Sequence, residues 1–425
     1  MDLIIHGWIV RKRVHGGIVF LDLRTLEYPG EIIQAVFKED IIGKEKLEEI
    51  SKLPLETSII IRGEKVRNPR LKIGFEILAK DYKITQKPLE EFPLGPKEHG
   101  VEAIMKYKHL SIRLPRYVKV WLIKEKVLKY FREWFEKNGW HEVTPPILVS
   151  SACEETTTLF EVGWFGNKAY LSQSAQLYLE AMIFSLGKVW SLTPSFRAEK
   201  SRTRRHLCEY WHLEWEAAWM GFEKLMKMID EFVSYCIRRL LEDREARKII
   251  EEFRGKDIKI LELATETPYE RVSYDEAIEI LQKKGLDVKW GDDLGADEER
   301  ELTLEFEKPI HLHHFPRIIK AFYMKVDRNR PETVLGTDLL LPEGYGEVIG
   351  AGEREDDYEI LLQKIKEFGL NPKDYQWYLD LRKYGSVPHS GGGLGVERFV
   401  MWILKLPHIR ETQPFPRLAR DKRFI

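Results

Sequence analysis

Apolar and polar positions alternate with a period of two in five short runs of the first 85 residues. The runs are LIIHGWIV, GGIVFLDLR, EIIQAVF, TSIIIRG and IGFEILAKDYKI, and such alternation is typical of half-buried β-strands. Between the third and fourth runs, the segment from Lys44 to Leu53 changes to a helical period, with Leu47, Ile50 and Leu53 on one face. The order is therefore three strands, one helix and two strands.

That order is the one expected of a five-stranded OB barrel, a fold that commonly binds single-stranded nucleic acid. A small barrel without a ligand has the same pattern, so the pattern predicts the fold and leaves the ligand open. The next segment, 86–110, concentrates Pro, Gly and charged residues, which is typical of a hinge between domains. We expect a barrel domain at 1–85, a hinge at 86–110 and a second domain at 111–425.

The second domain begins with a predicted helix from Val118 to Lys137, which Asn138-Gly139 ends. The residues expected on its apolar face are Trp121, Leu122, Leu128, Phe131 and Phe135. The next run, WHEVTPPILVS, has the composition of a strand. Because the prolines at 145 and 146 cannot donate ladder hydrogen bonds, we expect it at a sheet edge or an interface.

Later segments alternate between helix and strand signals. Residues 223–254 have a helical pattern, and residues 255–305 mix strand, helix and an acidic run, which we interpret as an insertion. The run HLHH, residues 311–314, is reminiscent of a metal site, but its alternation favours a strand with a structural role. The economical architecture is α+β, with a large antiparallel sheet flanked by helices.

Composition limits the class of protein but says little about which molecules it binds. With 425 residues, 43% of them hydrophobic, the chain can bury a large core in two or three domains. Its 68 basic and 69 acidic side chains balance, so any nucleic-acid surface must be a local patch. Three widely spaced cysteines argue against a disulfide framework, the N-terminus lacks a secretory pattern, and no apolar run approaches the ~18 residues of a membrane span. We expect a cytoplasmic protein without a membrane segment.

Two segments carry residues suited to nucleotide chemistry. Residues 195–214 read SFRAEKSRTRRHLCEYWHLE, a basic stretch that fits either a solvated helix face or a loop that grips a polyphosphate. Residues 390–399 read SGGGLGVERF, in which glycines allow a ligand to approach the backbone. Arg398 stands where a dinucleotide fingerprint needs a third Gly, which argues against a Rossmann site, but its guanidinium can stack on a planar base.

Together these segments resemble the class II aminoacyl-tRNA synthetases. The run Phe196-Arg197-Ala198-Glu199 with its basic loop is similar to motif 2, Gly393-Leu394-Gly395-Val396-Glu397-Arg398 is similar to motif 3, and the long helix with the strand ending at Pro146 is similar to motif 1. YLSQSAQLYLEA, WSLTPSFRAEKSRTRRHL and RKYGSVPHSG resemble the aspartyl/asparaginyl branch, and nearly the whole chain resembles its archaeal-type asparaginyl members. The resemblance implies ligation of asparagine to the 3′ end of tRNA(Asn), through an adenylate made with ATP.

The resemblance also implies roles for individual residues. In-line attack on the α-phosphate spreads negative charge that cations can stabilise. The side chains expected to hold ATP are Arg197 at the α-phosphate and the substrate carboxylate, His206 at the γ-phosphate, Glu199 at the adenine amino group, and Tyr210 and Arg398 on the two faces of the adenine. Of these, Arg197, Glu199, His206 and Arg398 are the expected catalytic residues. Asp338 and Glu347 are the expected ligands of Mg²⁺, which prefers carboxylate oxygens.

The pocket for the amino-acid side chain is expected to select asparagine. Aspartyl relatives carry a lysine where this chain has Leu179, so the cation that would hold a second carboxylate is missing. Glu214 and Arg354 are expected to bind the amide, because an amide offers both a donor and an acceptor, whereas aspartate would bring two carboxylates together. The resemblance further implies that Glu154 and Gln176 contact the α-amino and side-chain region of the substrate.

Three stretches near this pocket depart from the branch pattern. The usual Glu-Gly-Gly loop reads Glu154-Glu155-Thr156, the usual Gly-Gly-Ser-Gln-Arg run reads Gly350-Ala351-Gly352-Glu353-Arg354, and Gly392 replaces a phenylalanine. Loss of the two small residues after Glu154 is expected to stiffen a loop that closes over the substrate. The strictness of asparagine over aspartate is therefore left open at this point.

On the barrel, GWIVRKRVHGGIVF resembles the anticodon-binding face of the branch. Phe20 is the expected stacking residue, with Arg13 and Gln34 reading the central anticodon base. Without the resemblance, a lone phenylalanine on a strand is more typical of a buried core. Motif 1 of the family builds a two-fold interface, which implies a homodimer.

Three alternative functions are considered. An aspartyl or relaxed-specificity ligase would use nearly the same residues. Ammonia-dependent asparagine synthetases share the catalytic core, but they lack the barrel. A catalytically silent paralogue would only bind RNA, and the retention of the ATP residues argues against it.

Overall fold

A computed structural model of the chain describes residues 2–95, 99–153, 158–200 and 203–419. The chain forms two compact units, which adjoin in sequence between Leu122 and Ile123, inside a long helix. Among the described helices, none has the length and apolar character that crossing a membrane requires.

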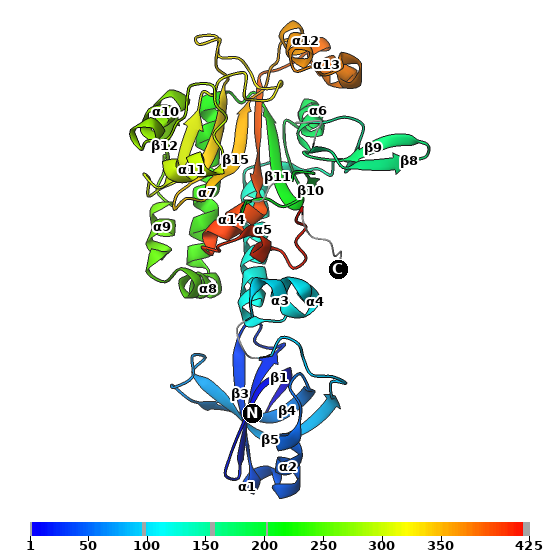
Figure 1. The fold of residues 1–425 in the computed structure, drawn as a ribbon, viewed down its shortest axis with the longest axis vertical. Coiled ribbons are helices and arrows are strands. Elements are labelled where there is room, and N and C mark those ends of the chain that lie inside the picture. Colours follow the sequence, from blue (N-terminus) through cyan, green and yellow to red (C-terminus); the bar gives the residue numbers. More distant parts are fainter. Residues whose placement is uncertain (1, 96–98, 154–157, 201–202, 420–425) are drawn as a thin grey trace. The chain divides into compact units, whose positions relative to one another are not determined.

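The first unit contains a closed barrel with the strand order β1-β2-β3-β5-β4 (Figure 1). Its strands are β1 (Leu3–His15), β2 (Ile18–Thr25), β3 (Ile32–Lys38), β4 (Ser58–Arg67) and β5 (Phe75–Gln86), with α1 (Glu39–Ile42) and α2 (Lys44–Lys52) between β3 and β4. Alternate residues fill the core, since Val19, Leu21 and Leu23 of β2 are buried. The predicted OB order is confirmed.

Three helices follow the barrel: α3 (Val101–Lys106), α4 (Lys108–Ser111) and α5 (Pro115–Lys137). All of α3 and most of α4 fall within 86–110, the segment expected to be a hinge. Helix α5 begins at Pro115 rather than Val118, and its predicted apolar face is partly wrong. The buried stripe is Val120, Ile123, Val127, Phe131, Trp134 and Phe135, whereas Trp121, Leu122 and Leu128 are only half-buried. The observed stripe follows i, i+3 and i, i+4 spacing and shares only Phe131 and Phe135 with the predicted face.

The second unit is built on an eight-stranded sheet with the order β12-β13-β14-β15-β16-β11-β10-β6. Its strands are β6 (His141–Glu142), β10 (Lys188–Phe196), β11 (Glu209–Ala218), β12 (Glu270–Ser273), β13 (Ile310–His313), β14 (Gly336–Leu341), β15 (Gly346–Glu353) and β16 (His389–Gly395). Neighbouring strands are antiparallel except for a parallel pair at each edge, β12 with β13 and β10 with β6. The α+β class with a large, mainly antiparallel sheet is confirmed.

Helices surround this sheet in the second unit (Figure 1). They are α6 (Gln176–Leu186), α7 (Phe222–Glu242), α8 (Arg244–Arg254), η2 (Gly255–Asp257), α9 (Ile258–Leu263), α10 (Tyr274–Lys283), α11 (Ala296–Thr303), α12 (Tyr358–Glu367), η3 (Pro372–Tyr375), α13 (Gln376–Lys383), α14 (Val396–Ile403) and η4 (Ile409–Thr412). Aromatic rings join them: the Phe131 ring lies 5.3 Å from that of Phe232 on α7 and 5.5 Å from that of Phe399 on α14. The helix predicted over 223–254 is two helices, because Asp243 ends α7 and caps α8.

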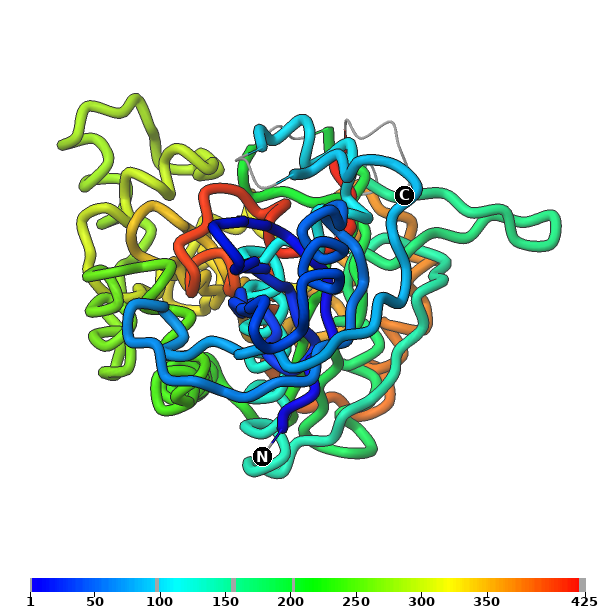
Figure 2. Tube along the Cα trace, turned by 90° about the horizontal axis from the view of Figure 1, so that it is seen from below, coloured from blue at the N-terminus to red at the C-terminus, as the bar shows by residue number. Residues whose placement is uncertain are grey.

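The strand predicted from WHEVTPPILVS is divided at its prolines. Only His141–Glu142 (β6) and Leu148–Val149 (β7) are strands, and the edge position expected for this run is confirmed for β6. Strand β7 pairs with β9 (Asn167–Leu171), which pairs with β8 (Glu161–Trp164). The β8–β9 hairpin projects away from the rest of its unit in both views (Figures 1 and 2).

His311, one histidine of the run, has a structural role in the core. His311 on β13 is fully buried, with Nε2 2.8 Å from Asp230 Oδ1 and Nδ1 3.0 Å from the Thr337 hydroxyl. These contacts join α7, β13 and β14 in the core of the second unit. Within the described ranges, no group of three His, Cys, Asp or Glu side chains has the arrangement of a metal site.

Candidate active site

Two adjacent antiparallel pairs of strands bring the basic and glycine-rich segments together. Ser195 near the end of β10 pairs with Tyr210 of β11, so Arg197 follows directly beyond the paired region. On the other side, β11 pairs with β16, with Glu214 opposite Gly393 and Trp215 opposite Gly392. The two segments are therefore neighbours in the sheet although almost 180 residues separate them in sequence.

Glycines are needed on β16 mainly because side chains of the neighbouring strand β11 lie against its backbone. A Cβ on Gly391 would lie 2.1 Å from the Glu216 carboxyl carbon, and one on Gly392 would lie 2.9 Å from the Trp215 ring. The indole of Trp215 thus fills space beside the glycine that replaces the usual phenylalanine. Gly393 and Gly395 are the members of the run that line the cavity described next.

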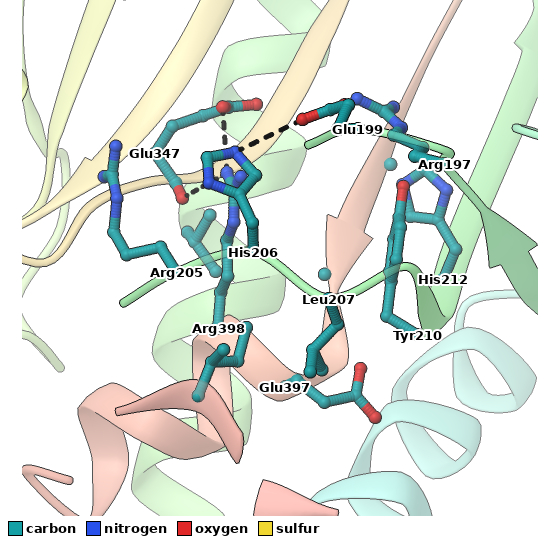
Figure 3. Close-up of a pocket in the computed structure, with 14 residues that line it drawn as sticks. Arg197, Glu199, Arg205, His206, Leu207, Tyr210, His212, Glu347, Glu397 and Arg398 are labelled. Carbon is teal, nitrogen blue, oxygen red and sulfur yellow. Dashed lines mark hydrogen bonds and ion pairs between the residues drawn. The ribbon is translucent and has the colours of Figure 1, made fainter. Parts of the chain in front are cut away.

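A small cavity of about 80 Å³ lies at the end of this sheet region (Figure 3). Its lining includes all five residues predicted to hold ATP, which are Arg197, Glu199, His206, Tyr210 and Arg398, together with Arg205, Leu207, His212, Glu347, Val348, Gly393, Gly395, Glu397 and Ile409. The structure therefore brings the predicted ATP residues together.

An ion pair and a histidine beside a carboxylate lie in the small cavity (Figure 3). Arg398 Nη1 donates to Glu347 Oε2 at 2.9 Å, and His206 Nε2 lies 3.8 Å from Glu199 Oε2. Burial, with the charges of Arg398 and Arg205, lowers the pKa of His206 to about 4. Burial alone would raise the pKa of Glu347, but Arg398 and Lys320 outweigh it and lower that pKa to about 2. Glu347 is therefore ionised and His206 is neutral at pH 7.

Sequence reasoning missed several side chains that hold this cavity in shape. Arg205 donates to Glu299 Oε2 at 2.7 Å, and the same oxygen accepts from the Glu347 backbone N–H at 2.8 Å. Glu397 accepts from Lys124 at 2.6 Å and from the Trp211 N–H at 3.0 Å. Arg205 lies in the basic run and could have been chosen, whereas Glu299 sits in an acidic run of the insertion without any distinguishing signal.

A large cavity of about 520 Å³ adjoins the small one. Its lining contains Ser174, Gln176, Arg197, His212, Glu214, Asp293, Ile318, Ile319, Lys320, Ala321, Phe322, Tyr323, Met324, Asp338, Glu347, Gly350, Arg354, Phe368, Gly392 and Gly393. Of the predicted substrate residues, Gln176, Glu214 and Arg354 line it. Glu154 lies outside the described residues.

Glu214 and Arg354 are held by different partners within the large cavity. The Glu214 carboxylate accepts from the Ser174 hydroxyl and, at 2.8 Å, from the Ala175 N–H at the start of α6. Arg354 donates to Glu216 Oε1 through Nε at 2.9 Å and through Nη2 at 2.5 Å. Glu216, which sequence reasoning missed, is fully buried, and burial raises its pKa in spite of Arg354.

Leu179 does not line the large cavity. Its side chain is fully buried in an apolar cluster with Ala175, Ile183 and Val189. The departure at Glu353 also points elsewhere: its carboxylate lies 3.0 Å from Lys325 Nζ and accepts from the N–H that begins α7. Leu179 and Glu353 therefore lie outside the cavity lining, whereas Gly392 is part of it.

The two predicted metal ligands lie on neighbouring strands. A Cβ on Gly350 would lie 3.4 Å from Glu347 Oε1 and 3.7 Å from Asp338 Oδ1, so both carboxylates face the same glycine. Lys320 Nζ donates to Asp338 Oδ2 at 2.6 Å. Burial, opposed by Lys320, raises the pKa of Asp338 to about 7. Two oxygen ligands fit Mg²⁺ when phosphate and water complete its octahedron.

The three predicted anticodon residues lie together on one face of the barrel. Arg13 donates to Gln34 Oε1 at 2.7 Å, and its guanidinium lies 5.4 Å from the centre of the Phe20 ring. Phe20 is half-buried between the core residues Val19 and Leu21, so it is not an ordinary core phenylalanine.

Comparison with known proteins agrees with this geometry. Residues 100–419 match the family described as tRNA synthetases class II (D, K and N), and residues 3–85 match the OB-fold nucleic acid binding domain. The asparagine–tRNA ligase of Pyrococcus furiosus is 54% identical over 97% of this chain and 93% of its own length, and that of Thermoplasma acidophilum is 42% identical over 98% and 95%.

Among solved structures, asparaginyl-tRNA synthetase from Pyrococcus horikoshii complexed with asparaginyl-adenylate is similar with a TM-score of 0.93 and 52% identity, covering 99% of this chain and 95% of that one. The asparaginyl-tRNA synthetase of Entamoeba histolytica, also with asparaginyl-adenylate, gives 0.88 and 33%, with 99% and 95% covered. The chain belongs to the class II tRNA synthetases of the D, K and N group.

Proposed function

We propose that this chain is an ATP-dependent asparagine–tRNA ligase, which forms asparaginyl-adenylate and transfers the asparagine to the 3′ end of tRNA(Asn). The observation that carries the proposal is the pair of adjoining cavities. One is lined by the cations Arg197, Arg205 and Arg398, and the other by the amide-matching pair Glu214 and Arg354. Relatives named asparagine–tRNA ligase over nearly the whole chain support it.

In the first step ATP occupies the small cavity. Arg197 holds the α-phosphate, His206 the γ-phosphate and Glu199 the adenine amino group, while Tyr210 and Arg398 cover the adenine faces. Arg398 and His206 lie beside carboxylates in this cavity, Glu347 and Glu199. On ATP binding the guanidinium would contact the base and the imidazole the terminal phosphate.

Asp338 and Glu347 would hold Mg²⁺ beside the triphosphate. The ion would neutralise phosphate charge and polarise the α-phosphorus. Lys320 and Arg398 lie against the two carboxylates and offset their charge. The other two oxygens, Asp338 Oδ1 and Glu347 Oε1, face Gly350 and would ligate the ion.

The charges around the large cavity favour a neutral substrate side chain. Among the described lining residues, the lysines and arginines are Arg197, Lys320 and Arg354, and the carboxylates are Glu214, Asp293, Asp338 and Glu347. Lys320 is the one lysine of this lining that could serve aspartate, but its ammonium lies 2.6 Å from Asp338. An asparagine amide can donate to Glu214 and accept from Arg354 without adding a charge.

The barrel face formed by Arg13, Phe20 and Gln34 would bind the anticodon, with a base stacked on Phe20. We further propose that the protein acts in the cytoplasm, as a homodimer through the motif 1 segments α5 and β6. The barrel argues against an ammonia-dependent asparagine synthetase. An aspartyl or relaxed-specificity ligase is the nearest rival, since it needs the same ATP residues.

Aminoacylation with purified tRNA transcripts tests the proposal. The chain should charge tRNA(Asn) with labelled asparagine when ATP and Mg²⁺ are present, and should fail when the central anticodon base is changed. Charging with aspartate would identify the rival ligase. Binding of tRNA(Asn) without any charging would identify a silent RNA-binding paralogue.

A further inference from the structure

The segment RKYGSVPHSG, residues 382–391, contains two buried cationic groups that neither cavity uses. Arg382 lies on α13 and His389 on β16, and both side chains are fully buried. Both are absent from the linings of the small and large cavities. They meet instead at Glu180 of α6, whose side chain is also fully buried.

One carboxylate oxygen of Glu180 receives these contacts. Oε2 accepts from Arg382 Nη2 at 2.6 Å and from the Tyr378 hydroxyl at 2.7 Å, and His389 Nε2 lies 2.9 Å from it. Burial would raise the pKa of Glu180, but Arg382 and His389 outweigh it and lower that pKa. The carboxylate is therefore ionised, and its contacts fix it between α6, α13 and β16.

The other oxygen of Glu180 holds a residue of the large cavity. Oε1 accepts from Nε2 of Gln176, one turn earlier on α6, at 3.0 Å, and Gln176 lines the large cavity. Because an ionised carboxylate can only accept, the Gln176 carboxamide must turn its nitrogen towards Glu180. Within the described residues nothing donates to the carboxamide oxygen of Gln176. This oxygen is therefore the acceptor that remains for a ligand in the cavity.

We propose that Glu180 is a positioning residue, which orients Gln176 so that its carboxamide oxygen accepts a hydrogen bond from the α-ammonium group of asparagine. The inference rests on the proposed function. Gln176 is expected at the α-amino and side-chain region of the substrate, where either end of its amide could be used. The orientation that Glu180 imposes joins an acceptor to a charged donor, which makes a strong hydrogen bond. The reverse orientation would set the NH₂ group of Gln176 against the ammonium.

This hydrogen bond should contribute to substrate binding and not to the chemical step. The new bond to the α-phosphorus forms at the carboxylate of asparagine, so the ammonium carries the same charge in the bound substrate and in the transition state. An interaction that is equal in both states lowers KM and leaves kcat unchanged. Loss of the orientation of Gln176 should therefore raise the KM for asparagine alone.

The variant Glu180→Gln tests the orientation directly. Its new carboxamide would keep the oxygen against Arg382 and Tyr378, because both of these donate. Its NH₂ group would then be directed at Gln176. Gln176 would flip to present its oxygen to that group, and its own NH₂ group would face the cavity.

A second variant and a matched control accompany it. Glu180→Asp keeps the charge opposite Arg382, so it guards against failure of Glu180→Gln to fold, but its side chain is one methylene too short to hold both its anchors and Gln176. The control is Asp380→Asn on α13. Asp380 accepts from Gln376 at the same i, i+4 spacing, but at the surface, and this variant should behave as the wild type.

Three measurements are needed. Asparagine-dependent ATP–pyrophosphate exchange gives kcat and both KM values, thermal unfolding shows whether each variant folds, and succinamate, which is asparagine without its amino group, gives an inhibition constant. We expect Glu180→Gln to raise the KM for asparagine about tenfold, with kcat, the KM for ATP and the inhibition constant of succinamate within about threefold of the wild type. A general disturbance of the cavity would weaken succinamate as much as asparagine.

The variant Gln176→Met shows whether Glu180 acts through Gln176. It removes the carboxamide and should itself raise the KM for asparagine about tenfold, and adding Glu180→Gln to it should cause no further rise. The proposal is overturned if Glu180→Gln leaves the KM for asparagine unchanged, weakens succinamate equally, or has its full effect in the Gln176→Met background. If Glu180→Gln does not fold, the same criteria apply to Glu180→Asp. A wild type that never uses asparagine would instead refute the proposed function.

Discussion

At the scale of single residues, the position of Leu179 bears on the stability of the fold, because its side chain lies in the core and not in the substrate cavity. Its side chain is fully buried with Ala175, Ile183 and Val189, so a lysine placed there meets an apolar cluster. We expect Leu179→Lys to reduce the free energy of unfolding by about 3–5 kcal/mol, since it buries an unpaired charge, and to leave aspartate unused. Urea denaturation measures the loss. Leu186→Lys, on the same helix at an exposed position, should unfold like the wild type, and equal stability of both variants would contradict the burial argument.

Phe20 carries the prediction for RNA binding. Its ring is half-buried beside Arg13 on the outer barrel face, where an unstacked base can lie against it. We expect Phe20→Ala to weaken tRNA binding by about 1–3 kcal/mol, which lowers kcat/KM for tRNA roughly five- to 150-fold. Asparagine-dependent exchange, which uses only the second unit, should be unchanged. Glu48→Gln on α2 is the matched surface control, and an equal effect of both variants on charging would exclude the stacking role.

The sequence predicted individual site residues well where they belong to a motif, and poorly where tertiary packing alone brings them to the site. Arg197, Glu199, His206, Tyr210 and Arg398 come together as expected. The partners Glu216, Glu299 and Lys320 could not be found, because they come from β11, the insertion and the loop after β13 and have no local pattern.

At the scale of elements, Asp243 joins three helices. It ends α7, caps α8 by accepting from the N–H groups of Glu245 and Ala246 at 3.0 Å, and accepts from Lys126 and Tyr130 of α5 at 2.8 Å. The helical pattern of 223–254 continues through this point, so sequence alone predicted one helix. A cap is a hydrogen-bond feature with no effect on apolar periodicity.

We expect Asp243→Ala to lower the free energy of unfolding by about 2–3 kcal/mol at pH 7, from the lost cap and the charged hydrogen bonds. Burial would raise the pKa of Asp243, but Lys126, the Ala246 N–H and Tyr130 reverse this and lower it below 3.8. A lowered carboxylate pKa stabilises the fold above the unfolded value, so the difference from the wild type should shrink as the pH falls below about 4.

Chemical denaturation of both proteins at pH 7, 5 and 3 measures this dependence. Glu279→Gln on α10, which removes only an exposed pair with Lys283, is the control and should follow the wild type at every pH. A deficit for Asp243→Ala that stays constant down to pH 3 would show that the carboxylate charge is not involved.

At the scale of the whole molecule, the order of strands and helices was predictable from sequence, but the strand pairing at the two edges of the large sheet was not. The barrel pattern and the α+β class followed from periodicity, because a half-buried strand and an amphipathic helix each leave a regular trace. The parallel pairs at the two sheet edges and the apolar face of α5 depended on tertiary contacts. The insertion at 255–305 had an unclear role in the sequence, yet its Glu299 anchors both Arg205 and the backbone of Glu347.

The central claim is that the second unit activates asparagine because its large cavity has no surplus of positive charge. ATP–pyrophosphate exchange with purified protein, Mg²⁺ and either asparagine or aspartate tests this claim most directly. We predict exchange with asparagine and at least a hundredfold lower kcat/KM with aspartate, a ratio equivalent to about 2.7 kcal/mol. Equal or faster exchange with aspartate would contradict the account.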